Sequence, residues 1–181
     1  MNCFNYIKTQ YTLIIFGDTG KPTIIEKVLS RVIVDTLGKV ADDICITVIL
    51  DDDGMGYSEL KKVISDKLRS ISKDKSKFTS NQFPTLEEHN DSFILIPLKG
   101  RGNVEIRLST VPESLEKQVA KKCIEVKYPK NLKILERGPH YALDFLAMEY
   151  YDGNKEKLIR ETSALLKDEV WVTDVVERAT S

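Results

Sequence analysis

The sequence predicts an α/β protein with a mostly parallel sheet flanked by helices. Two observations lead to this prediction: β-branched and aromatic runs alternate with amphipathic stretches in the first part of the chain, and the later part is mostly helical in pattern. Of the 181 residues, 41% are hydrophobic and 30% are charged, which is typical of a globular protein with its own core. We expect an α/β core over residues 1–110 and a mostly helical extension over residues 111–181 that packs on the same domain.

The first predicted unit is a strand followed by a loop and a helix. Residues 11–16, YTLIIF, are rich in β-formers and stop at Gly17, which indicates a buried strand. Pro22 then lies near a helix start, and Gly38 is a typical stop signal. Apolar residues recur at helical spacing between them, at Ile25, Val28, Leu29, Val32 and Ile33.

The second unit repeats this order and leads to a third strand. Residues 44–50, ICITVIL, form a continuous β-branched run, typical of a central strand covered on both faces. An amphipathic helical stripe follows over residues 60–71. Residues 72–91 are polar and predict a surface loop, after which SFILIPL predicts a strand that ends near Pro97.

The rest of the chain is mostly helical in pattern. Residues 100–108, GRGNVEIRL, lead into either a strand or a helix. Residues 113–125 predict a helix, Pro139 opens another through Tyr150, and a last one covers about residues 155–167.

Composition excludes several classes of protein. The N-terminal MNCFNYIKTQ lacks the features of a signal peptide, and no apolar run approaches the roughly 18 to 20 residues of a membrane span. We therefore expect a cytoplasmic protein without a membrane partner. Cys3, Cys45 and Cys123 include no CxxC pair, which argues against a disulfide framework or a zinc cluster.

Charge is balanced overall and uneven locally. The net charge of −1 gives no general preference for nucleic acid. Residues 61–77 and 117–133 are rich in lysine and arginine, and such runs are either solvated helix faces or sources of phosphate contacts.

Three consecutive aspartates follow the second predicted strand. In a parallel sheet, ligands bind beyond the carboxyl ends of the strands, and alternation along an extended chain points Asp51 and Asp53 to the same side. Neighbouring carboxylates raise each other's pKa unless a cation intervenes, and their oxygens suit Mg²⁺ or Mn²⁺. The alternative is a plain Asp-Gly turn, in which Asp52 or Asp53 helps to cap the following helix. The residues alone leave both interpretations open.

The run VILDDDGMG resembles the second signature of Toprim domains, in which a strand ends in Asp-x-Asp before a glycine-rich turn. The element order over residues 11–97 is similar too, and IPLKGRGNVEIRL resembles the Pro, Gly and Glu pattern of a small group of uncharacterised prokaryotic, largely archaeal, Toprim-like proteins. The resemblance covers about the first 110 residues. It implies a Toprim/Rossmann-like fold and a Mg²⁺-dependent phosphoryl-transfer centre of the kind used by topoisomerases, bacterial primases and certain nucleases.

The resemblance assigns Asp51 and Asp53 as metal ligands, but the first Toprim motif is altered. Those families end their first strand in a glutamate that serves as general acid or base. Here Gly17 holds that position and Asp18 follows it, displaced by one residue and one methylene shorter. Asp18 is thus a candidate catalytic residue, as a metal ligand, or else a turn residue. Two functions stay open: a metal-dependent nuclease or other phosphotransfer enzyme, and a catalytically inactive module that binds nucleic acid, nucleotide or protein.

Further candidates come from the loops at the expected sheet end. Glu105 is the third acid nominated for the cluster, or else lies on a solvated face. Lys99 and Arg101 stand between glycines and suit phosphate binding, as does Lys21 in GDTGKP. The GDTGKPT spacing and Pro22 exclude a Walker A loop. A receiver-like acidic pocket has less support, because its acidic pair and later lysine are not placed as such a domain requires.

Overall fold

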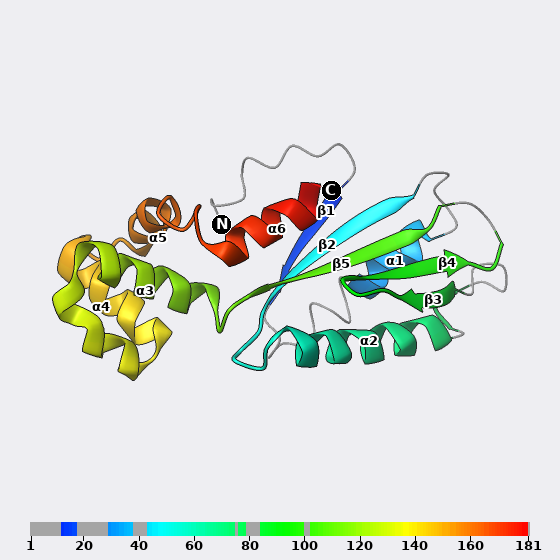
Figure 1. Ribbon diagram of the computed structural model, residues 1–181, viewed down its shortest axis with the longest axis horizontal. Coiled ribbons are helices and arrows are strands. Elements are labelled where there is room, and N and C mark those ends of the chain that lie inside the picture. The colour runs from blue at the N-terminus through cyan, green and yellow to red at the C-terminus, as the bar shows by residue number, and fades with distance from the viewer. Residues whose placement is uncertain are drawn as a thin grey trace.

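The protein combines an open mixed sheet with a lobe of helices (Figure 1). The structure is a computed structural model that describes residues 12–17, 29–37, 43–74, 76–78, 84–99 and 102–180. Within these residues the sheet has five strands in the order β1-β2-β5-β4-β3. Their bounds are Thr12–Gly17 for β1, Ile44–Asp51 for β2, Pro84–Glu88 for β3, Ser92–Pro97 for β4 and Val104–Val111 for β5.

Strand direction differs between the two halves of the sheet. β2 is parallel to both β1 and β5, whereas β4 is antiparallel to β5 and to β3. The segments 89–91 and 98–103 join these antiparallel strands, and they are shorter than the dozen or so residues that a parallel crossover needs. The predicted mostly parallel sheet is therefore not confirmed, because the third predicted strand, β4, enters through hairpins.

One face of the sheet packs against α1 (Ser30–Thr36) and α2 (Tyr57–Lys73). Alternate residues of the central strands supply this core because side chains alternate across a strand. The helices add leucine and isoleucine at helical spacing, and the whole cluster is closed to solvent. Its central members are Ile46, Val48, Leu50, Val104, Ile106, Leu108, Leu60, Ile64 and Leu68.

The opposite face carries several polar side chains of β2 and β5 and is partly covered by α6 (Val170–Thr180), which lies across β1, β2 and β5 (Figure 1). Thr47 and Ser109 point to this side and are fully buried. Both are hydrogen bonded: Ser109 Oγ donates to Asp174 Oδ2 at 2.9 Å and Thr47 Oγ1 to the Arg178 carbonyl at 3.4 Å. Polar bonds therefore fix the C-terminal half of α6 on the sheet.

A second core lies in the helical lobe. It is formed by α3 (Leu115–Lys127), the 3₁₀ helix η2 (Pro129–Arg137), α4 (Pro139–Tyr150) and α5 (Lys155–Ser163), and it includes Ile49 and Val111 from the sheet. The α4 prediction is confirmed, whereas η2 and α6 were not predicted as separate elements. None of the helices in the described ranges is both long and apolar enough to cross a membrane.

Two other sequence predictions changed. The expected loop at residues 72–91 contains the end of α2 and all of β3. β3 is an edge strand that begins at a proline and exposes Glu87 and Glu88, so its composition is that of a loop. Residues 104–108, left open between strand and helix, belong to β5.

Candidate acidic site and the α6 cavity

The three aspartates lie at the carboxyl edge of the parallel strands. β2 ends at Asp51, opposite Val111 of β5, and Gly17 at the end of β1 is opposite Leu50. The end of β1 therefore lies beside the acidic turn. The predicted location of Asp51 is confirmed, and this edge faces the helical lobe (Figure 1).

Two of the aspartates hold the connection between β5 and α3. The Asp52 amide donates to the Val111 carbonyl at 3.0 Å, and Asp52 Oδ1 accepts from the amides of Gly54 at 2.8 Å and Glu113 at 2.6 Å. Asp51 Oδ1 accepts from the Leu115 amide at 3.0 Å. Since Leu115 is the first residue of α3, its N–H has no partner within the helix, and a carboxylate there also interacts favourably with the helix dipole.

These bonds correct one sequence interpretation. The turn-and-cap alternative expected Asp52 or Asp53 to cap the following helix, α2. That helix starts after Gly56 without a side-chain cap, and the carboxylate of Asp51 meets the start of α3 instead. Two of the three carboxylates therefore have a structural role, because they accept hydrogen bonds from backbone N–H groups at the connection between β5 and α3.

Asp53 is the most exposed of the three. Its φ of 48° is in the left-handed region, which aspartate tolerates better than most residues. Its amide donates to the carbonyl of Glu113 at 2.9 Å, and Glu113 also has a positive φ, 61°. Gly54, with a φ of 79°, completes a turn whose backbone disfavours other side chains.

Glu105 does not join the aspartates. It is the second residue of β5 and pairs with Cys45, whereas Asp51 pairs with Val111. The two residue pairs lie six positions apart along β5 (111 − 105), which corresponds to about 20 Å at roughly 3.3 Å per residue. The expectation of a three-acid cluster with Glu105 is wrong, because Glu105 lies near the amino end of a strand parallel to β2.

The predicted phosphate-binding residues are separated from the acidic turn as well. Lys99 follows β4, which is antiparallel to β5, so it lies at the amino edge of β2 and β5. The expectation that it shares the aspartates' sheet end is wrong for the same topological reason. Asp18, Lys21 and Arg101 lie outside the described residues. In the described part of the chain, no group of three or more His, Cys, Asp or Glu side chains is arranged to hold a metal ion.

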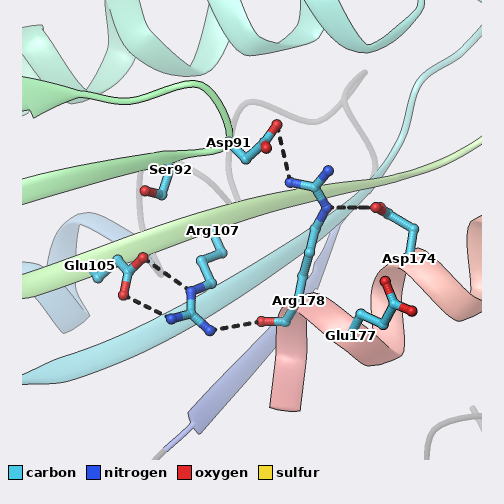
Figure 2. A pocket seen from close by; sticks show the side chains of 7 residues that line it. All are labelled: Asp91, Ser92, Glu105, Arg107, Asp174, Glu177 and Arg178. Carbon is cyan, nitrogen blue, oxygen red and sulfur yellow. Dashed lines mark hydrogen bonds and ion pairs between the residues drawn. The ribbon is translucent and has the colours of Figure 1, made fainter. Parts of the chain in front are cut away.

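A polar cavity of about 440 Å³ opens between α6, β5 and the start of β4 (Figure 2). Sequence reasoning missed it, because its residues come from three separate segments. It is lined by Asp91, Ser92, Glu105, Arg107, Asp174, Glu177 and Arg178.

Ion pairs within this cavity fasten α6 to the sheet. Arg107 binds the Glu105 carboxylate through two nitrogens, at 3.1 and 3.0 Å, and its Nη1 donates to the Arg178 carbonyl at 3.2 Å. Arg178 Nε donates to Asp174 at 2.9 Å, and its Nη1 lies 3.4 Å from Asp91 Oδ1 (Figure 2). The hydrogen bonds that Arg107 donates to the Glu105 carboxylate raise the pKa of Arg107, so Arg107 stays charged.

The charged residues of this cavity therefore have a structural role, because they connect α6 to the sheet. The two guanidinium groups are engaged by carboxylates of the protein itself. The nearby thiol of Cys45 is half-buried, and burial raises its pKa, so it is a poor nucleophile near neutral pH.

Comparison of the chain with protein-family models, with curated proteins and with solved structures returns no match.

Proposed function

We propose that the protein binds a divalent cation, Mg²⁺ or Mn²⁺, at the acidic turn after β2, and with it a phosphodiester or nucleotide. The observation that carries the proposal is that β2 ends at Asp51, two residues before Asp53, next to the end of β1 at the carboxyl edge of a parallel strand pair. This is the edge at which α/β sheets bind ligands.

The donor set of the turn fits a hard cation. It consists of carboxylate oxygens, with Asp53 exposed and Asp51 half-buried beside it in sequence. Mg²⁺ commonly takes one or two protein carboxylates, keeps several waters and adds phosphate oxygens of its ligand. A bound cation would offset the charge of adjacent carboxylates and of a phosphate. Asp51 would also keep the turn in place through its bond to α3.

A second candidate, an inactive binding module, is favoured by Gly17. This residue ends β1 beside the acidic turn and supplies no acid where the resembled enzymes have glutamate. General acid or base assistance is typically worth about 10² to 10⁴ in rate. Cleavage assays on labelled DNA and RNA with MnCl₂ separate the two candidates, with Asp51→Asn as the control for contaminating nuclease.

The cation site is tested by thermal unfolding with and without MgCl₂ or MnCl₂. A cation at a hundred times its Kd stabilises the folded state by about 2.7 kcal/mol. Asp53→Asn should abolish this stabilisation, because asparagine keeps the backbone conformation and removes the charge. The matched control is Asp152→Asn, an exposed aspartate with a φ of 52° in the helical lobe. A full metal response in Asp53→Asn would contradict the assignment.

A further inference from the structure

The cations of the α3–η2 segment divide into two groups. Residues 115–137 contain seven lysines and arginines and three glutamates. Four of the cations form ion pairs within the lobe or with its entry, namely Lys117, Lys121, Lys122 and Lys127. The other three, Lys130, Lys133 and Arg137, lie on η2, are exposed, and have no acidic partner among the described residues.

η2 presents these cations on its solvent-exposed side. None of its nine residues is buried, and Leu132 is 57% exposed. A 3₁₀ helix has three residues per turn, so Lys130 and Lys133 lie in one row. Glu136 shares that row, which leaves the face with three positive charges against one negative charge. Runs of 3₁₀ helix this long are uncommon. Ile134 and Leu135 of η2 pack partly against the core of the lobe, whereas its cations are exposed.

Oriented aromatic rings flank the cations. Arg137 lies 5.2 Å from the centre of the Tyr141 ring and donates to its hydroxyl at 2.8 Å, while the tyrosine is 43% exposed. At the other end of η2, Tyr128 stacks on Tyr150 with ring centres 3.7 Å apart and an angle of 9° between the planes. Contacts within the protein thus hold the rings next to cations that have no acidic partner among the described residues.

We infer that the outer face of η2, together with Tyr141, binds a single strand of nucleic acid. Cations beside rings suit a strand whose phosphates and unstacked bases are both accessible, since bases stack on aromatic side chains and phosphates pair with cations. A duplex offers its phosphates only, and an acidic peptide offers no series of planar bases. The ligand class rests on the proposed function. Asp51 bonds to the first residue of α3, so the acidic turn and this lobe are held together.

The test is fluorescence anisotropy with labelled single-stranded DNA and RNA, and with a duplex, in EDTA. The variant Lys130→Gln/Lys133→Gln/Arg137→Gln should bind the single strands about tenfold or more weakly, and its salt slope should fall by about 2, since each phosphate contact contributes about 0.7. The matched control removes three other exposed cations of the lobe, in Lys157→Gln/Arg160→Gln/Lys167→Gln, and should keep the wild-type affinity.

Stacking is tested at Tyr141. Tyr141→Leu should weaken binding about 5- to 150-fold, the range for loss of one stacking ring, without changing the salt slope. Tyr141→Phe keeps the ring and should keep the affinity. Because the three replaced side chains are exposed, the triple variant should unfold close to the wild-type temperature.

Several results would overturn the inference: absence of wild-type binding to single strands, equal loss in both triple variants, or equal affinity for duplex, polyglutamate or anionic vesicles. Failure of the cation site would be distinguishable. In that case MgCl₂ or MnCl₂ would change the unfolding temperature of Asp53→Asn and of the wild type to the same extent. Binding to single strands in EDTA, which needs no cation, would persist.

Discussion

Replacing Asp52 by alanine tests whether the acidic turn supports the fold. The Asp52 carboxylate accepts two backbone N–H groups, from Gly54 and from Glu113, and the second bond joins the turn to the β5–α3 connection. Asp52→Ala removes both acceptors. Hydrogen bonds to charged groups contribute about 1.5 to 3 kcal/mol each when well shielded, but this side chain is half-buried, and water replaces part of the loss. We expect a loss of about 1 to 2 kcal/mol in the free energy of unfolding.

Two asparagine variants separate hydrogen bonding from charge. Asp52→Asn keeps an oxygen acceptor and should lose less stability than Asp52→Ala. Asp53→Asn should leave the metal-free protein as stable as the wild type or more so, because it removes one of several neighbouring negative charges. The measurement is urea unfolding, in which the midpoint should change and the m-value should not. Full stability of Asp52→Ala combined with a marked loss in Asp53→Asn would refute the reasoning.

Two further predictions concern the sheet and its covering helices. Arg178→Met should lower the free energy of unfolding by about 1 kcal/mol, because it removes the ion pairs to Asp174 and Asp91, whose side chains are 42% and 63% exposed, and Asp174 keeps its hydrogen bond from Ser109. Arg160→Met, an exposed arginine of α5, is the control, and equal urea midpoints for both would contradict the role of Arg178 in holding α6 on the sheet. Hydrogen bonds donated by Ser65, and then by Arg69, lower the pKa of Glu88 below its usual 4.5. The ionised carboxylate therefore stabilises the folded state above about pH 4.5, and this stabilisation is lost as the pH falls through the lower pKa of the folded protein. Glu88→Gln should therefore lower the free energy of unfolding at pH 7 and reduce the further loss of stability below about pH 4.5, as measured by urea unfolding across this pH range. An unchanged dependence of stability on pH would show that the interactions of Glu88 do not stabilise the fold.

Local patterns in the sequence were sufficient for several elements. The β-branched run of β2, the amphipathic stripe of α2 and the proline at the start of α4 each report on burial or backbone geometry within a few residues. The position of Asp51 at a strand end followed from the same local signals. These features depend on short-range sterics and on which face of an element is apolar.

The tertiary structure alone decided which distant residues meet. The direction of β4 depends on the short segment 98–103, and that direction separates Lys99 from the acidic turn. The bond from Leu115 to Asp51 spans 64 positions, and the bond from Arg107 to the Arg178 carbonyl spans 71. Local periodicity carries no information on such pairs, because the packing of all elements selects them together. Local patterns therefore predict that carboxylates follow a buried strand, whereas packing of the whole chain places α3, and not Glu105, beside them.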